Sequence, residues 1–160
     1  MLPVKSLLRP LLCVAVIAAL ALPALHAQRE KLPPEDREFV EKTWPEAKKT
    51  NTGIRFIVLK EGSGAIGQPG DRVKVLYTGR LLNGTIFDQK LDPKDPFTLR
   101  IGRGEVIRGW DQILQLMKAG EKRIVIVPPE LAYGTRGQPP RIGRDATLVF
   151  EMEVIELSKE

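Results

Sequence analysis

Residues 106–117, with the sequence VIRGWDQILQLM, decide the fold class, because they hold the clearest helical pattern in a chain otherwise patterned for strands. Five apolar side chains recur there at the three- and four-residue spacing that places them on one face of a helix: Ile107, Trp110, Ile113, Leu114 and Met117. Gly120 follows where a helix end is expected. We therefore predict one short helix with a buried apolar face.

On both sides of this helix the sequence predicts strands. Val73, Val75 and Tyr77 alternate with less apolar neighbours, which is typical of a half-buried strand. Asn83-Gly84 is a strong hairpin signal, and Pro128-Pro129 ends an apolar run. The ranges expected as strands are 54–59, 72–77, 85–88, 97–101, 124–127 and 148–154. Strands joined by hairpins and loops, with one helix, predict an α+β fold in which an antiparallel sheet packs on that helix.

Length and composition agree with one domain and a short extension. The chain has 160 residues, 42% of them hydrophobic, and a formal charge of +5. That apolar content is enough for a real core and excludes disorder of the whole chain. One Cys and one His exclude an intrachain disulfide framework and any multi-Cys zinc site.

The first 27 residues have the pattern of a secretory signal peptide. Lys5 and Arg9 precede an uncharged apolar run, Leu11–Leu22, which Pro23 ends, and a small residue at 27 suits cleavage. The alternative is an uncleaved membrane anchor. The twelve apolar residues fall short of the roughly 20 that a spanning helix needs, so we expect no membrane anchor after cleavage. The prediction is an exported protein, periplasmic or secreted if the source is bacterial.

Removal of residues 1–27 takes away Cys13 and His26, together with two basic residues, and leaves a charge of +3. A mature chain without Cys or His excludes thiol nucleophiles, Ser-His-Asp triads and histidine-ligated metals. Its basic residues are interleaved with acidic ones, so nucleic acid is not an expected partner.

Residues 28–50 differ from the remainder, because they are rich in charge and poor in apolar residues. Pro33-Pro34 followed by two acids predicts a short helix to about Trp44, with Phe39, Val40 and Trp44 on one side. Two interpretations stay open for this segment. One is a charged, solvated linker with a transient helix, and the other is a docking or dimer-forming element.

Five short phrases in residues 51–160 are too specific to follow from composition: Leu76-Tyr77-Thr78-Gly79, Phe87-Asp88, residues 104–110 (GEVIRGW), Ala132-Tyr133-Gly134, and residues 146–150 (ATLVF). In this order and spacing they resemble the FKBP-type peptidyl-prolyl cis-trans isomerases. The resemblance implies a twisted antiparallel β-sheet of five or six strands wrapped around one short α-helix. It covers the whole expected globular part.

The resemblance also implies an apolar pocket that receives a proline side chain, with no metal and no cofactor. Asp88, Tyr133 and Phe87 take the catalytic positions. The positions that bind substrate are Tyr77, Phe97, Val106, Ile107, Trp110, Ile142 and Phe150. The backbone N–H of Ile107 and the hydroxyl of Tyr133 are the implied donors to substrate carbonyls, and Asp88 is expected inside the apolar pocket.

The aromatic residues support this assignment independently. Seven lie in residues 51–160, and six of them fall on pocket positions, with Phe56 the exception. Each alone is more simply an ordinary core residue. Six converging on one site favour a pocket for a small apolar group.

The function implied is acceleration of X–Pro isomerisation in exported proteins during folding, by desolvation of the imide and stabilisation of its twisted form. The expected partners are Pro-containing polypeptides and macrolide inhibitors of the tacrolimus or rapamycin type. A non-catalytic chaperone or Pro-segment binder is the alternative. Arg141 stands where an apolar residue is common in the family, which bears on substrate preference. Lys90 and Lys94 are candidate partners of Asp88.

Overall fold

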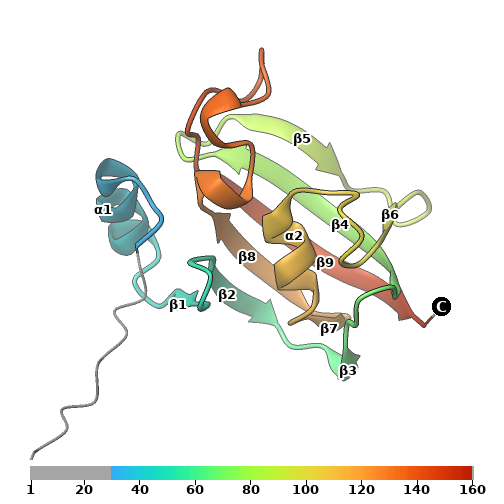
Figure 1. The fold of residues 1–160 in the computed structure, drawn as a ribbon. Coiled ribbons are helices and arrows are strands. Elements are labelled where there is room, and N and C mark those ends of the chain that lie inside the picture. Colours follow the sequence, from blue (N-terminus) through green and yellow to red (C-terminus); the bar gives the residue numbers. More distant parts are fainter. Residues whose placement is uncertain (1–29, 160) are drawn as a thin grey trace, which may run out of the picture.

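The computed structural model describes residues 30–159, so the expected signal peptide at residues 1–27 lies outside the described residues. The elements run α1 (Pro34–Thr43), β1 (Lys48–Lys49), β2 (Arg55–Lys60), β3 (Ser63–Ile66), β4 (Arg72–Leu81), β5 (Ile86–Lys90), β6 (Phe97–Arg100), α2 (Arg108–Leu114), β7 (Lys118–Ala119), β8 (Lys122–Val127), two 3-10 turns (Pro129–Leu131, Gly134–Arg136) and β9 (Leu148–Ser158). Figure 1 shows a twisted sheet with α2 across one face.

The sheet is antiparallel throughout and is organised by its two long strands. The strand order is β1-β2-β8-β9-β4-β5, and β6 also pairs with β4. The pairing of β4 with β9 extends from Arg72 opposite Ser158 to Leu81 opposite Leu148. On its other edge β4 pairs with β6 through Arg72–Val75 and with β5 through Tyr77–Arg80. A short ribbon of β3 and β7 lies outside this sheet.

The α+β class is confirmed, and the structure adds small elements that the sequence pattern did not predict. The described residues hold seven strands in the main sheet, two in the ribbon, and two α-helices. We expected five or six strands around one helix, and a separate short helix before this domain. The extra strands β1, β3 and β7 have two to four residues, which is too short for an alternation pattern to be visible.

Helix α2 supplies the core on the concave side. Trp110, Ile113, Leu114 and Met117 are at most 4% exposed, as the periodicity predicts. The helix itself is shorter than residues 106–117, because Ile107 has extended backbone angles (φ −58°, ψ 148°) and precedes the first turn.

Gly109 lets α2 approach the sheet closely. A Cβ at this position would lie 2.5 Å from the Cγ1 atom of Val127, which is closer than real Cβ contacts come. Because glycine has no side chain, α2 can pack directly against β8 at this point.

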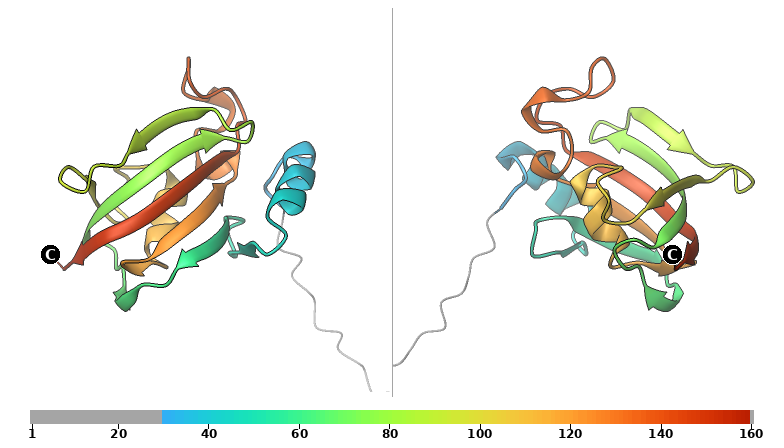
Figure 2. Two further views of the ribbon diagram at one scale, coloured as in Figure 1. Left: turned by 180° about the vertical axis from the view of Figure 1, so that it is seen from behind. Right: turned by 45° about the vertical axis from the view of Figure 1, so that its right-hand side comes forward.

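Helix α1 lies at the outer side of the sheet, near one end of β8 and β9 (Figures 1 and 2). Leu32 and Val40 pack there with Ile126 and Val149. Neighbouring strand residues such as Val125 point into the main core instead, because successive side chains alternate between the two faces of a sheet. Residues 30–43 thus form an N-terminal arm folded on the sheet.

The arm matches the helix expected from Pro33-Pro34 to about Trp44, with one correction. Val40 is fully buried, but Phe39 is 45% exposed and meets Trp44 edge to face at 6.3 Å. Trp44 packs on the same cluster as Val40, so Phe39 is the one of the three side chains that does not reach it. The burial of Leu32 and Val40 also argues against a solvated linker in this stretch.

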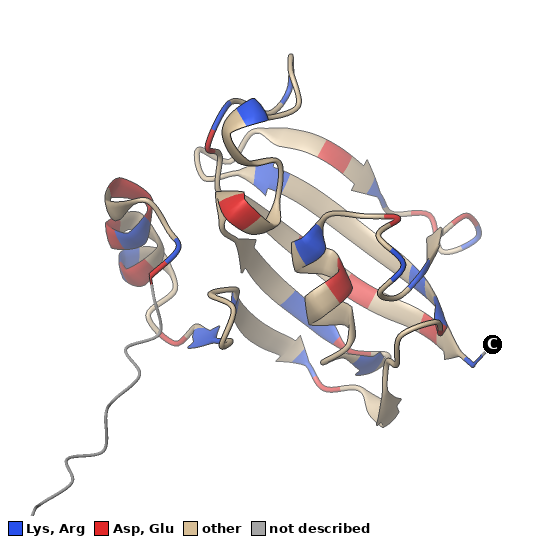
Figure 3. Ribbon diagram, viewed as in Figure 1, with Lys and Arg blue, Asp and Glu red and all other residues tan. Residues whose placement is uncertain are grey.

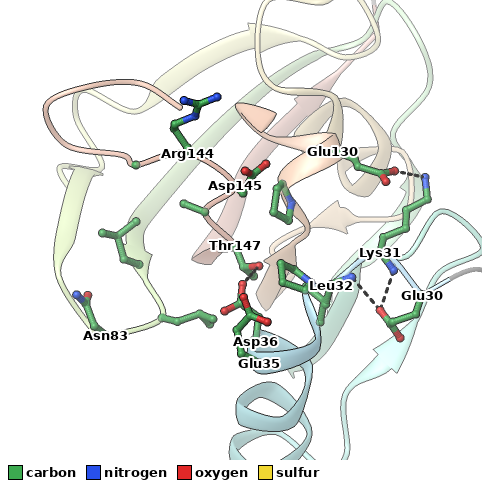
Figure 4. A pocket seen from close by; sticks show the side chains of 16 residues that line it. Glu30, Lys31, Leu32, Glu35, Asp36, Asn83, Glu130, Arg144, Asp145 and Thr147 are labelled. Atoms are coloured by element: carbon green, nitrogen blue, oxygen red, sulfur yellow. Dashed lines mark hydrogen bonds and ion pairs between the residues drawn. The ribbon is translucent and has the colours of Figure 1, made fainter. Parts of the chain in front are cut away.

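Polar contacts attach the arm to the loop after β8 and to the start of β9 (Figure 4). The hydroxyl of Thr147, which is 3% exposed, donates to Oδ2 of Asp36 at 2.5 Å. Lys31 pairs with Glu130 at 3.2 Å. A cavity of about 750 Å³ opens between these contacts and the β4–β5 turn.

Glu30 anchors the beginning of the arm. Its carboxylate accepts hydrogen bonds from the backbone N–H groups of Lys31 and Leu32 and from the side chains of Lys49 and Arg55, all near 2.9 Å. Burial raises the pKa of this carboxyl, but the four hydrogen bonds outweigh burial and lower the pKa to about 2. The charged form of Glu30 therefore stabilises the docked arm.

Candidate functional site

One cavity of about 210 Å³ lies between α2, the sheet and the loop after β8. Most of its lining is aromatic or aliphatic. The lining residues are Tyr77, Phe87, Asp88, Phe97, Glu105, Val106, Ile107, Trp110, Tyr133 and Phe150. Six of these ten side chains are aromatic, so the cavity offers an apolar surface with few polar groups.

Different elements bring these side chains together. Tyr77 lies on the central strand β4, Phe87 and Asp88 on β5, and Phe150 on β9. Trp110 comes from the first turn of α2, and Tyr133 from the loop between β8 and β9. The cavity therefore depends on long-range pairing and cannot exist in any one segment of the chain.

The rings meet edge to face around Trp110. Its ring centroid lies 4.8 Å from that of Tyr77, 5.3 Å from Phe150 and 5.9 Å from Phe97, with interplanar angles between 83° and 88°. Phe87 extends the cluster through Phe150, at 5.7 Å. Such contacts each add stability beyond area burial and hold the rings in fixed orientations. The walls of the cavity are thus preformed.

Gly79 makes room for this cluster. A Cβ on Gly79 would lie 2.7 Å from Cζ of Phe87 and 2.9 Å from Cε1 of Phe150. The glycine of the Tyr77-Thr78-Gly79 phrase is therefore required by the two rings that lie over it.

Asp88 lies at the rim of the cavity, which corrects the expectation that it sits inside an apolar pocket. The residue is exposed, although its carboxylate borders the cavity. Oδ2 accepts a 2.6 Å hydrogen bond from the hydroxyl of Tyr77, and Oδ1 accepts one from the N–H of Gln89. Lys90, considered as its partner, pairs instead with Asp95. The register of β4 and β5 shifts between Gly79 and Arg80, opposite Asp88 and Ile86, which interrupts regular alternation and lets Phe87 and Asp88 both border the cavity.

Both tyrosines of the cavity stay protonated at neutral pH. Burial raises the pKa of Tyr77, and the hydrogen bond to Asp88 raises it further. Burial also raises the pKa of Tyr133, with the negative charge of Asp88 adding to the effect. The hydroxyl of Tyr77 donates its proton to the hydrogen bond with Asp88. The hydroxyl of Tyr133 is also neutral and lies at the edge of the cavity.

Backbone bonds hold the loop that carries Tyr133. The carbonyl of Tyr133 accepts from the N–H of Gly137, and the N–H of Asp145 donates to the carbonyl of Gly134 at 2.9 Å. At the tip of the loop, Nη1 of Arg141 donates to the carbonyl of Phe87 at 3.0 Å. The loop is thereby joined to β5 on the other side of the cavity.

Nine of the ten residues predicted for the site line this one cavity, and the tenth does not. Ile142 is 2% exposed and belongs to the main core. Glu105 lines the cavity and was not predicted. Its Oε2 accepts the N–H of Arg100 at 3.0 Å. Its position next to Val106 in the GEVIRGW phrase is the only sequence signal that points to it.

The described residues contain no cluster of three or more His, Cys, Asp or Glu side chains arranged for a metal ion. In residues 30–159 no helix has the length and apolarity needed to cross a membrane.

Comparison with known proteins agrees with this geometry. Residues 64–155 match the family model described as FKBP-type peptidyl-prolyl cis-trans isomerase. Human peptidyl-prolyl cis-trans isomerase FKBP4 is 47% identical over 113 residues, which are 70% of this chain and 25% of that protein. The chain thus spans about a quarter of the length of this relative. Human FKBP2 is 49% identical over 90 residues, 56% of this chain and 63% of that protein.

Two solved structures share the fold. A peptidyl-prolyl cis-trans isomerase from Pseudomonas syringae pv. tomato superposes with a TM-score of 0.69 and 37% identity, covering 78% of this chain and 92% of that chain. FkpA from Escherichia coli gives a TM-score of 0.70 and 35% identity, covering 78% of this chain and 58% of the other. On the family match, these identities and the shared fold, the chain belongs to the FKBP-type peptidyl-prolyl cis-trans isomerase family.

Proposed function

We propose that this protein accelerates the cis–trans isomerisation of X–Pro bonds in polypeptide clients, with the proline side chain seated in the aromatic cavity. The observation that carries the proposal is the ring cluster of Tyr77, Phe97, Trp110 and Phe150, which surrounds a cavity of about 210 Å³. A proline ring is a compact apolar group, and the lining offers it apolar contact on several sides.

The reaction makes and breaks no covalent bond, which suits a site without nucleophile. The barrier of about 20 kcal/mol comes from the partial double-bond character of the imide. An apolar cavity removes water from the imide and destabilises its planar, more polar form relative to the twisted form. The preformed walls supply this environment without reorganisation.

In this proposal two donors orient the client. The hydroxyl of Tyr133, whose pKa is raised above its ordinary value by burial and by the charge of Asp88, is one. The backbone N–H of Ile107, which lies just before the first turn of α2, is the other. In this proposal they bind client carbonyls on either side of the proline, and Phe87 and Asp88 form the wall along which the carbonyl rotates.

A kinetic assay on a short peptide with one X–Pro bond tests the proposal. We expect rate enhancement over the uncatalysed reaction, reduced by both Asp88→Leu and Tyr133→Phe. Enhancement that neither variant reduces would overturn the site assignment. Absence of enhancement with intact peptide binding would favour the alternative, a chaperone or Pro-segment binder that uses the same cavity without catalysis.

We also propose that the cavity binds macrolides of the tacrolimus or rapamycin type, as the family resemblance implies. The relative from Rhizopus delemar named FK506-binding protein 4 is 44% identical over 109 residues. Isothermal titration of the full chain with tacrolimus, and competition between tacrolimus and the peptide, test this point.

We further propose that the protein is exported, with residues 1–27 removed as a signal peptide and residues 51–160 forming the catalytic domain. The charged n-region and the twelve-residue apolar run support the signal. Mass spectrometry of the protein recovered from cell fractions identifies the cut and the compartment. Nucleic acid is not a proposed partner, since acidic and basic residues alternate over the fold (Figure 3).

A further inference from the structure

A second cavity, of about 570 Å³, adjoins the aromatic cavity along strand β5. Its lining comprises residues 85–89 of the strand and its approach, together with Pro140 and Arg141 of the loop after β8. Phe87 and Asp88 line both cavities. Because an extended chain advances only about 3.3–3.6 Å per residue, a client with proline in the first cavity has a flanking residue within reach of the second.

Arg141 is the cationic group of this second cavity, which also contains Asp88. Its guanidinium donates through Nη1 to the carbonyl of Phe87 at 3.0 Å, which holds the side chain across the cavity. Among residues 30–159 no carboxylate pairs with Arg141, and the bond to Phe87 is the one hydrogen bond that it makes. A guanidinium has five N–H donors in a planar fork that matches a carboxylate.

The surrounding charge favours an acidic partner. Residues 133–144 contain Arg136, Arg141 and Arg144 and no Asp or Glu, and Figure 3 shows this loop projecting from the fold with its basic positions in blue. The negative charge of Asp88 opposes the binding of an anion. Its two oxygens accept hydrogen bonds from the hydroxyl of Tyr77 and the N–H of Gln89. Selection of a carboxylate therefore requires that the client group lies nearer to Arg141 than to Asp88.

The apolar part of the lining suits the carbon stem of a longer side chain. Ile86 is 54% exposed, and Pro140 lines the same cavity from the loop. A glutamate can lay its two methylene groups on this surface and reach the guanidinium with its carboxylate. A lysine of similar length meets the same surface but places a positive charge beside Arg141.

We propose that the second cavity is a subsite for the client residue that flanks proline, and that Arg141 makes it select a carboxylate side chain. The substrate class is therefore a proline segment with an acidic neighbour. This inference rests on the proposed function, because it requires the proline to occupy the adjacent cavity.

The test compares blocked peptides in which the residue before proline is Glu, Gln or Lys, and a second series in which the residue after proline is varied. Exchange NMR measures kcat/KM without a coupling protease, whose own charge preference would interfere. Each value is divided by the uncatalysed rate of the same peptide. At low salt we expect Glu to exceed Lys by roughly two- to fivefold in one series, with the ratio falling as salt is added.

The variants decide whether Arg141 is responsible. Arg141→Gln brings the Glu-to-Lys ratio close to one, and Arg141→Glu reverses it. Arg136→Gln, in the same loop but outside both cavities, removes an equal charge farther from the client and should lower the ratio much less than Arg141→Gln. Circular dichroism and urea unfolding confirm that each variant folds. A wild type without preference in either series, or a ratio that Arg141→Glu does not change, would overturn the proposal.

A second readout separates this inference from the proposed function. If no peptide is isomerised faster than in buffer, catalysis is refuted, and fluorescence anisotropy of the same labelled peptides then tests the subsite alone. Tighter binding of the Glu peptide that is lost in Arg141→Glu supports the subsite. Equal binding of the Glu and Lys peptides refutes it.

Discussion

The hydroxyl of Tyr77 donates a 2.6 Å hydrogen bond to the carboxylate of Asp88, and so joins the buried wall of the aromatic cavity to its exposed rim. The two residues lie on neighbouring antiparallel strands, where Asp88 is opposite Gly79 and Tyr77 is diagonal to it. The contact fixes the direction of the carboxylate relative to the cavity. It also uses the Tyr77 hydroxyl, which leaves Tyr133 as the tyrosine donor for a client.

Tyr77→Phe tests the importance of this contact. The ring still packs on Trp110, but Asp88 loses a charge-assisted hydrogen bond, so we expect kcat/KM to fall about tenfold with little loss of stability. Asp88→Asn and the double variant complete a double-mutant cycle, in which kcat/KM for the X–Pro peptide is compared. If the two residues act through this hydrogen bond, kcat/KM of the double variant should be no lower than that of the poorer single variant. Fully multiplicative effects of the two changes would show that the contact has no part in the reaction.

Gly79→Ala is expected to displace the rings of Phe87 and Phe150. The added methyl would lie under 3 Å from both rings, so the free energy of unfolding falls by about 1–3 kcal/mol and peptide affinity is lost. Urea unfolding and peptide titration measure the two effects. Gly143→Ala is the control, because a Cβ there meets no atom within 4 Å. Equal stability of the two variants would refute the proposed role of Gly79.

Thr147→Val removes the hydroxyl that attaches the arm through Asp36. The substitution preserves shape but leaves the carboxylate without this partner, and we expect a loss of about 1–2 kcal/mol in the free energy of unfolding. Thr135→Val, at an exposed position of the same loop, serves as the control. Hydrogen exchange should show faster exchange in residues 34–43 for Thr147→Val alone. Unchanged exchange in the arm would contradict the attachment.

Glu30→Gln is expected to remove the part of the pH dependence of stability that comes from Glu30. The pKa of Glu30 is about 2 in the folded protein against 4.5 for an ordinary glutamate, so its charge stabilises the fold fully above pH 4.5. This contribution, about 2 kcal/mol after allowance for solvent screening, is lost as the pH falls from 4.5 towards 2. Urea unfolding of wild type and variant should therefore differ at pH 7 and converge on acidification.

The exposed Glu46 offers the matched control, since Glu46→Gln changes the same group without the cluster of donors. It should leave the free energy of unfolding unchanged at pH 7. A difference between wild type and Glu30→Gln that persists unchanged to pH 3 would show that the charge of Glu30 is not the cause.

The core of the fold could be predicted from sequence because its elements have strong periods. The alternation of Val73, Val75 and Tyr77 and the helical spacing of Trp110, Ile113 and Leu114 each correspond to a buried face. The arm was harder to predict. Val40 is buried only because Leu32, Ile126 and Val149 meet it from far along the chain, and no local pattern carries that information.

The site could likewise be predicted from sequence only in part. The family resemblance placed nine residues that line one cavity. The exposure of Asp88 and the burial of Ile142 depend on which way each side chain points in the folded strand and loop. Arg141 was visible in the sequence as a departure from the family. Its contact with Phe87, and the second cavity beside it, required the tertiary structure.

Exchange NMR of an X–Pro peptide with the intact protein, compared with Tyr133→Phe and Asp88→Leu, is the decisive test of catalysis at this cavity. We expect the wild type to shorten the isomerisation time at substoichiometric concentration, and each variant to lose a large part of this effect while remaining folded. Isomerisation at the uncatalysed rate in the presence of the folded wild-type protein would contradict this expectation.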